Sequence, residues 1–359
     1  MTRRQVLAGL AVAVSPTPSW ADVGGPTYLS AAREPDGSFS LYGLGTDGVD
    51  RFRIALPGRG HAAAAHPRRP EAVAFARRPG LFALAIDCRT GQVKARLQAP
   101  DRRHFYGHGC FSSDGSVLYT TENAFESGEG QIGLWSTDEG YRRIGELPSG
   151  GIGPHEVVRL PGKDTLVVAN GGIRTHPANG REKLNLAAMR PNLAYIAEDG
   201  SISDLHEMDP EMHRNSLRHL AAGADGLVAC ATQWQGDPFD APPLLALHRR
   251  GSPLRMVGST GPGHARLQAY AGSVAFSGRG DRVGFTAPRG GRAQVYSVED
   301  GRLLQEIHRP DICGIAPLRH GFMATDGIGG VSAVGADGLQ TLTRANRAWD
   351  NHLVSIEHG

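Results

Sequence analysis

Five histidines of this chain recur at the same point of a repeated pattern, and most of them open a short apolar run such as His108-Gly-Cys-Phe-Ser. The five are His61, His108, His155, His219 and His352. Imidazole is the commonest metal ligand in proteins, and three or more neutral imidazoles at one point suit copper, zinc or iron better than calcium or magnesium. The pattern therefore predicts a transition-metal site, on condition that the fold brings these side chains together.

A second signal, independent of the histidines, shows how the chain repeats. Seven strand-like segments each end in a glycine turn, at intervals of about 40 to 60 residues, which is close to the period of a four-stranded propeller blade. The segments are 41–48, 82–91, 132–140, 193–200, 244–251, 294–301 and 330–338. A radial arrangement of such units would direct the five histidines to one axis.

Between these segments, short β-type runs alternate with Gly, Asp and Pro, and there is no convincing long amphipathic helix. Seven units predict an all-β fold, one closed seven-bladed β-propeller of the YncE/WD40-like kind. The run 351–356 is expected to form the innermost strand of the blade whose other strands begin at Thr27, so that the two ends of the chain close the ring. The unbroken periodicity predicts a single domain over 22–359.

Residues 1–21 are interpreted as an export signal outside the fold. Thr2-Arg3-Arg4-Gln5-Val6-Leu7 resembles the twin-arginine motif, an apolar stretch covers 6–14, and Ser19-Trp20-Ala21 offers a cleavage site. A chance arginine pair in a Sec-type leader is the alternative. No later run is long enough to span a bilayer. We therefore expect a soluble protein of the periplasm, exported by the twin-arginine pathway.

Charge and cysteine content exclude some classes of function. The chain has 38 basic and 36 acidic residues, a balance that gives no support for binding to nucleic acid or to a membrane through a polybasic segment. The four cysteines permit two disulfides in an oxidising compartment, but the predicted blades bring none of them together. We interpret them as core residues: Cys88, Cys110, Cys230 and Cys313.

Neighbouring strands of a blade are antiparallel, so the start of the innermost strand lies level with the end of the second strand and the loop after it. Polar residues there are expected to line the site or to fix the ring tautomers of the histidines. They are Glu122, Asn123, Glu156, Asn170, Gln233, Asp326 and Asp350. Long loops on the same face, where function is commonly carried, contribute a further set. That set is His104, His176, Arg181, Lys183 and Trp234.

Two blades lack the histidine, because Ser273 and Gly314 stand at the equivalent positions. The ring is therefore expected to be incomplete, with room for an exogenous ligand or water. His66 competes with His61 for the place in its blade. The alternative to a metal is a polar channel filled with ordered water, or a small-anion site. Carboxylates beside the centre would favour iron, and histidines alone would favour copper.

Several segments resemble a known family: the twin-arginine leader, Gly107-His108-Gly109, Gly153-Pro154-His155-Glu156, the run 169–185 and Ser216-Leu-Arg-His-Leu220. They resemble an uncharacterised bacterial periplasmic family catalogued as domain of unknown function 1513. Its members are often encoded beside imelysin-type and dihaem peroxidase-like proteins thought to act in iron uptake. The resemblance implies periplasmic metal handling, with such proteins as partners. A histidine ring on a seven-bladed propeller is also similar to the copper-cluster domain of nitrous oxide reductase.

The sequence thus predicts a periplasmic propeller that binds iron or copper through axial histidines, with iron favoured by the family context. It would serve metal acquisition or an associated redox step, and whether it is an enzyme stays open. One alternative is a propeller hydrolase or lactonase-type enzyme, which would need a carboxylate-rich axial site and calcium. The other is a metal-free interaction scaffold whose upper loops dock a partner.

Overall fold

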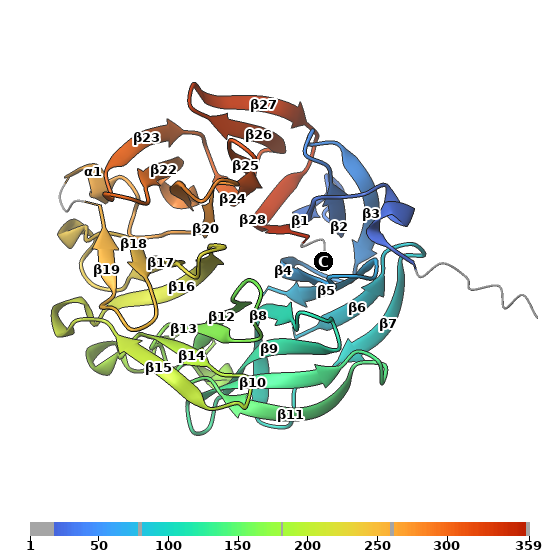
Figure 1. The fold of residues 1–359 in the computed structure, drawn as a ribbon, viewed down its shortest axis with the longest axis horizontal. Coiled ribbons are helices and arrows are strands. Elements are labelled where there is room, and N and C mark those ends of the chain that lie inside the picture. Colours follow the sequence, from blue (N-terminus) through green and yellow to red (C-terminus); the bar gives the residue numbers. More distant parts are fainter. Residues whose placement is uncertain (1–17, 78–80, 181, 259–261, 357–359) are drawn as a thin grey trace, which may run out of the picture.

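Short strands joined by Asp-x-Gly and related turns build the whole architecture. In the turn after Phe111, Asp114 accepts a hydrogen bond from the backbone N–H of Ser116, and Gly115 adopts a φ of 80° that favours glycine. The computed structural model describes residues 18–77, 81–180, 182–258 and 262–356. In it, seven antiparallel four-stranded sheets form a ring (Figure 1). This confirms the predicted seven-bladed β-propeller.

The strands of the first four blades are given from the axis outward. Blade 1 comprises β28 (Ala348–Ser355), β1 (Tyr28–Arg33), β2 (Phe39–Leu44) and β3 (Asp50–Leu56). Blade 2 comprises β4 (Gly60–Ala65), β5 (Glu71–Ala76), β6 (Ala83–Asp87) and β7 (Gln92–Leu97). Blade 3 comprises β8 (Arg103–Phe111), β9 (Val117–Ala124), β10 (Glu129–Ser136) and β11 (Arg142–Pro148). Blade 4 comprises β12 (Pro154–Arg159), β13 (Leu166–Asn170), β14 (Asn192–Ile196) and β15 (Ile202–Glu207).

The other three blades follow the same order. Blade 5 comprises β16 (Asn215–Ala222), β17 (Val228–Trp234), β18 (Leu245–His248) and β19 (Arg255–Val257). Blade 6 comprises β20 (Ser273–Phe276), β21 (Arg282–Ala287), β22 (Arg292–Ser297) and β23 (Leu303–His308). Blade 7 comprises β24 (Ile312–Leu318), β25 (Gly321–Asp326), β26 (Gly330–Gly335) and β27 (Gly338–Arg344).

Helices in the described residues are single turns. They are η1 (Trp20–Val23), η2 (Pro177–Asn179), η3 (Leu186–Ala188), η4 (Pro210–Met212), η5 (Pro238–Asp240), η6 (Pro288–Gly290) and α1 (Pro262–Ala265). None of these described helices has the length and apolar character needed to cross a membrane.

Closure of the ring follows the expected plan. The C-terminal strand β28 pairs with β1, with Tyr28 opposite Ser355, and the N–H of Ile356 donates to the carbonyl of Thr27 over 2.9 Å. Strand β28 also lies between the inner strands of blades 2 and 7 (Figure 1). One blade is therefore built from both ends of the chain.

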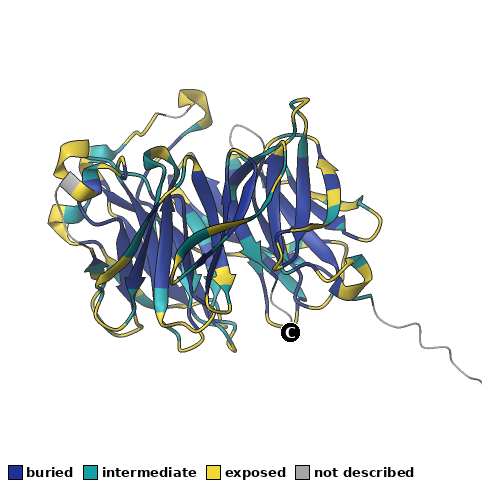
Figure 2. Cartoon of the chain, turned by 90° about the horizontal axis from the view of Figure 1, so that it is seen from above, coloured by how far each residue is buried: buried dark blue, intermediate teal, exposed yellow. Residues whose placement is uncertain are grey.

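Apolar side chains pack between neighbouring blades and not at the axis. Seven clusters of buried residues fill the seven junctions, and the strands are buried along most of their length while the loops of both faces are exposed (Figure 2). No disulfide joins the cysteines in the described structure; Cys110 is half-buried and the other three are buried. This packing leaves the axis to the first residues of the inner strands.

The start of the described chain packs onto the propeller. Trp20, which the sequence interpretation assigns to the export signal, is 3% exposed and lies in the cluster between blades 1 and 2. Its indole N–H donates to the carbonyl of His66 over 2.8 Å. Cleavage after Ala21 would remove this side chain from the core. Residues 1–17, which carry the arginine motif, lie outside the described residues.

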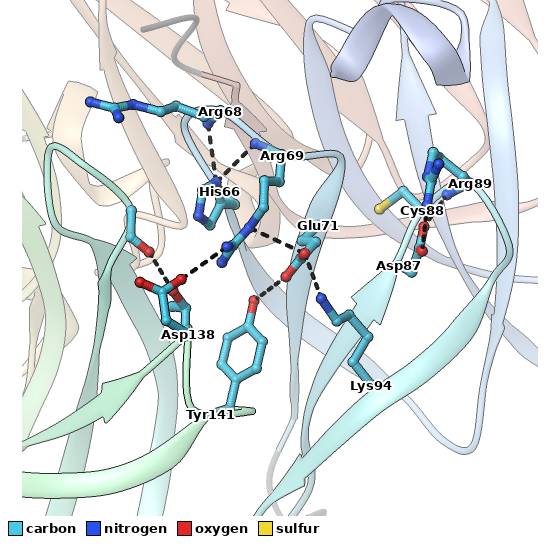
Figure 3. A network of polar contacts seen from close by, with 12 residues as sticks. His66, Arg68, Arg69, Glu71, Asp87, Cys88, Arg89, Lys94, Asp138 and Tyr141 are labelled. Carbon is cyan, nitrogen blue, oxygen red and sulfur yellow. Dashed lines mark hydrogen bonds and ion pairs between the residues drawn. The ribbon is translucent and has the colours of Figure 1, made fainter. Parts of the chain in front are cut away.

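His66 lies in the turn after β4, within a polar network that joins blades 2 and 3 (Figure 3). Its Nδ1 accepts hydrogen bonds from the backbone N–H groups of Arg68 (3.1 Å) and Arg69 (2.9 Å). Arg69 pairs with Glu71 of its own blade and, over 3.1 Å, with Asp138 of the next. The role of His66 is therefore that of a turn cap, and the place at the axis belongs to His61.

Acidification is expected to destabilise the protein through His66. Burial, aided by the charge of Arg69, lowers its pKa to about 4, whereas the unfolded chain takes up the proton near the ordinary value of about 6.5. Stability should therefore fall as the pH drops from about 6.5 to about 4, by up to about 1.4 kcal/mol per pH unit. Urea denaturation across this pH range measures the slope.

The matched control is His66→Asn, because an Asn side-chain oxygen can accept the same turn hydrogen bonds and does not titrate. The variant should show a shallower pH dependence than the wild type. Equal slopes for the two proteins would contradict the assignment.

Candidate metal centre

The five repeated histidines all lie on innermost strands: β4, β8, β12, β16 and β28. At each of these places the pairing with the neighbouring strand is interrupted by a register shift, for example between Pro154 and Glu156 in β12. A β-bulge bends the strand and redirects a side chain. The bulges turn the histidines toward the axis, where a regular strand would alternate its side chains between the two faces of the blade.

The imidazole rings meet above the channel. Eight pairs among the five rings have centroids 4.6 to 6.1 Å apart. The shortest contact joins Nε2 of His61 to Nε2 of His108 over 3.2 Å. Close approach depends on Gly107 (φ 100°), because a Cβ at that position would lie 2.8 Å from Cδ2 of His61.

Two groups of three rings have nitrogen atoms that all lie within 4.8 Å of one another. The first is His61, His108 and His352, and the second is His108, His155 and His219. His108 belongs to both. Two nitrogen ligands of a tetrahedral metal with bonds of about 2.05 Å stand about 3.3 Å apart. The observed separation of 3.2 Å between His61 and His108 matches that spacing.

Burial disfavours the protonated form of four of these imidazoles. His108, His219 and His352 are 3%, 2% and 6% exposed, and the other two are half-buried. Burial, followed by the proximity of the other ring residues and nearby arginines, lowers the pKa of His61, His155 and His352 well below the usual value. Burial also lowers the pKa of His219, although Glu156 opposes that shift. Neutral rings offer the lone pairs that a metal requires.

Three ring nitrogens of this group have no hydrogen-bond partner within the described structure: Nδ1 of His61, Nδ1 of His155 and Nε2 of His352. An unsatisfied buried polar atom costs about 1–3 kcal/mol. A bound ion or an ordered water would remove this cost. The arrangement therefore leaves three ring nitrogens that a bound ion or an ordered water would satisfy.

Glu156 fixes two of the rings from below. Its Oε2 lies 3.2 Å from Nδ1 of His219 and accepts the N–H of Leu220 over 3.1 Å, and its Oε1 lies 3.5 Å from Nδ1 of His108. Burial alone would raise the pKa of Glu156, but its close contacts with His108 and His219 hold it well below its ordinary value. An ionised carboxylate on Nδ1 leaves Nε2 of each ring free to coordinate.

A cavity of about 270 Å³ extends along the axis beside this group. His108, His219, His352 and Glu156 form part of its wall, and small or apolar residues of the inner strands form most of the rest. On the side of blades 6 and 7, Ser273 and Gly314 stand where histidines stand elsewhere. The ring is thus incomplete, which leaves room for an exogenous ligand.

The other six residues expected beside the histidines make their hydrogen bonds within or between blades. Glu122 accepts from Arg143 over 2.7 Å, and Asn123 donates to the carbonyl of Thr175. The other four residues also bond to neighbouring groups within or between blades. Asn170 bonds to Ser149 and Asn192, Gln233 to the carbonyl of Ala271, Asp326 to Arg309, and Asp350 to Arg59 and Arg77. Five of the six stand on second strands, whose side chains point between the blades, and Asp350 on the inner strand β28 is held by two arginines.

The expected loop residues lie in loops or beside them. The ring of His104 on β8 stacks on the ring of Phe125, with centroids 6.1 Å apart. The ring of His176 meets the ring of Phe125 edge-on, with centroids 5.0 Å apart. Lys183 donates to the side chain of Gln235, and Trp234 donates to the carbonyl of Asp237. Arg181 lies outside the described residues. The contacts of these side chains hold the upper loops together.

Sequence reasoning missed the arginines next to the ring. The positive charge of Arg218 helps to lower the pKa of His155, and that of Arg77 does the same for His61 and His352. Arg218 directly precedes a ring histidine in the sequence, and this adjacency was the available signal. Arg77 reaches the site from the end of β5, and nothing in the sequence indicated that it would.

A family model described as "Protein of unknown function (DUF1513)" matches residues 54–356. No curated protein matches the chain. Among solved structures, the chain is similar to the hydrazine synthase of Kuenenia stuttgartiensis, with a TM-score of 0.60 and 12% identity over 93% of this chain and 99% of that one. It is also similar to the β-propeller domain of Cps50 (Swd1) of Myceliophteria thermophila, with a TM-score of 0.59 and 12% identity over 86% and 91%. At this identity the likeness concerns the fold alone.

Proposed function

Since this chain belongs to the DUF1513 family, whose description gives no function, we propose a function from the site itself: the propeller binds a transition metal through its axial histidines. The observation that carries the proposal is the convergence of five imidazoles with ring nitrogens that lack partners. The half-buried carboxylate of Glu156 adds one negative charge beside the rings, and the nearby Arg77 is itself paired with Asp350 over 2.7 Å, which supports a cation at the centre.

The donor set favours copper over iron. Imidazole suits both metals, whereas iron centres in proteins commonly include a carboxylate ligand. Glu156 is engaged with Nδ1 atoms and the backbone, and Glu122 pairs with arginine inside its blade. Iron, which the family resemblance implies, is the second candidate. Zinc serves as the redox-inactive comparison.

The same donor set argues against the hydrolase alternative. A calcium-dependent propeller hydrolase needs several carboxylates at the axis. Among the described residues that line the channel, Glu156 supplies the carboxylate, and histidines hold it. A calcium requirement together with esterase activity would reverse this choice.

We place the activity in the periplasm, on the basis of the twin-arginine motif at Arg3-Arg4. The role is metal acquisition or a redox step carried out beside partner proteins, for which imelysin-type and dihaem peroxidase-like proteins are the candidates. The incomplete ring supports a role in which an exogenous ligand reaches the metal.

Elemental analysis of the full-length protein tests the proposal. The protein is stripped of metal, reconstituted anaerobically with copper, iron or zinc, and freed from unbound ions. We expect stoichiometric copper, with nitrogen hyperfine coupling in the electron paramagnetic resonance spectrum of the oxidised form. A variant with His108→Ala should lose the axial equivalent of metal, while His320→Ala, a change at an exposed histidine, should keep it. A wild-type protein that retains no stoichiometric transition metal would end the proposal, and co-purification of a partner with that metal-free protein would favour the scaffold.

A further inference from the structure

A second group of potential ligands lies far from the axis, where blade 4 meets blade 5. Asp204 and His206 stand on β15, the outermost strand of blade 4, and His248 ends β18 in blade 5. Figure 1 shows these two strands in neighbouring blades. One ligand atom from each residue lies within 4.8 Å of the others, and the two imidazole centroids are 4.1 Å apart. No residue of the axial ring takes part.

His248 is buried and directed into this group. It is 1% exposed, and its Nδ1 is hydrogen-bonded to the hydroxyl of Tyr195 over 2.7 Å. Its other ring nitrogen, Nε2, has no hydrogen-bond partner within the described structure. A hydrogen bond on Nδ1 that orients the ring and leaves Nε2 free is the arrangement in which histidine ligands are commonly held.

The two residues of β15 complete the arrangement. Nε2 of His206 faces Oδ1 of Asp204 over 3.0 Å. The N–H of Leu205 donates to Oδ1 over 3.0 Å, and the N–H of Gly251 donates to Oδ2 over the same distance. Both side chains are about one-fifth exposed, so an ion can reach them from solvent.

We propose that Asp204, His206 and His248 form a second metal site, which takes zinc or a divalent ion of the same class. Two imidazoles and one carboxylate are a common zinc ligand set, and three protein ligands leave a position for water. The ion would join the outer strand of one blade to the third strand of the next, and it would satisfy the unpartnered Nε2 atom of His248. This site is independent of the axial centre in its residues and in its ligand chemistry.

The chain supplies a matched control on the equivalent strand of blade 6. Glu306 and His308 stand on β23 with the same spacing as Asp204 and His206, and their Oε1 and Nε2 atoms are 3.2 Å apart. His308 bonds instead to Arg292, and no third ligand residue joins this pair in the described structure. Both blades therefore carry an acidic residue and a histidine two positions apart on the outermost strand. A third ligand residue, His248, is present only beside the pair of blade 4 in the described structure.

Zinc titration of the metal-free full-length protein by calorimetry tests the site, with zinc content measured after gel filtration. We expect His206→Gln and Asp204→Asn each to lose one equivalent of zinc relative to the wild type, or to bind it at least tenfold more weakly. His308→Gln should match the wild type. Zinc should also raise the melting temperature of the wild type more than that of His206→Gln, which confirms that the variant is folded and lacks the ion.

Repeating the titration in a His108→Ala background separates this site from the axial one. The equivalent that depends on His206 should persist there, whether or not the axial ring binds metal. Equal zinc content and equal zinc-induced stabilisation in the wild type and His206→Gln would overturn the second site and leave the axial proposal untouched.

Discussion

Removal of residues 348–359 is expected to abolish cooperative folding of the entire ring. This change deletes β28, the inner strand of blade 1, and exposes the paired edge of β1. It also deletes Trp349 and Leu353, which are buried between blades 7 and 1. Truncation of one such side chain costs about 2–5 kcal/mol, and a domain is stable by about 5–15 kcal/mol in total. Thermal unfolding followed by circular dichroism should show no cooperative transition.

A circular permutant is the control for this deletion. Because the N–H of Ile356 donates to the carbonyl of Thr27, the two ends lie close together, and a flexible linker from Ile356 to Pro18 would keep Trp20 and make blade 1 continuous. New termini can be opened at the exposed turn around Asp300, between β22 and β23. The permutant should unfold cooperatively. A deletion variant that kept a native-like transition would show that the ring does not depend on its closure.

Replacement of Glu156 by Gln should weaken metal binding at the axis by about 10–100-fold, the usual effect of losing a residue that orients a ligand. The amide has one oxygen, which can accept from Leu220 and His219 as Oε2 does. Its NH₂ group then faces Nδ1 of His108 and drives the proton of that ring onto Nε2. The Nε2 atom that meets His61 would lose its lone pair. Competition titration with a chelator of known affinity measures the change.

Glu122→Gln is the informative comparison, because Glu122 is also buried and stands at the end of a second strand. Glu122 pairs with Arg143 and Arg103. The variant should lose about 3 kcal/mol of stability, which is the low end for breaking a buried ion pair, because both arginines are partly exposed. Its metal affinity should be unchanged. Equal effects of the two variants on affinity would contradict the different roles given to these carboxylates.

Repetition is what made the ring predictable from sequence. Five histidines at one phase of a propeller repeat must come together when the blades are arranged around an axis, and the closure by 351–356 followed from the same count. The direction of side chains was not predictable in this way. Glu122 and Asn170 have the right height, but whether a strand residue points to the axis depends on a bulge that leaves no clear mark in the sequence.

The cluster of Asp204, His206 and His248 shows a second limit. Its members come from two blades and meet at the junction of blades 4 and 5. The repeat defines each blade but not how far neighbouring sheets slide past each other. Trp20 shows a similar limit. Its position in the expected cleavage site gave no sign that its side chain packs between blades 1 and 2.

The register shifts in the inner strands limit how many histidines the ring can contain. Strand β20 pairs without a shift from Ser273 onward, so a histidine placed there would lack the bend that aims the other five. Strand β24 has the shift, but a Cβ on Gly314 would lie 2.5 Å from the hydroxyl oxygen of Thr325 and 2.9 Å from the nitrogen of Leu353. A single substitution to histidine at position 273 or 314 is therefore not expected to add a sixth imidazole to the ring. The gap in the histidine ring on the side of blades 6 and 7 is therefore fixed by the backbone.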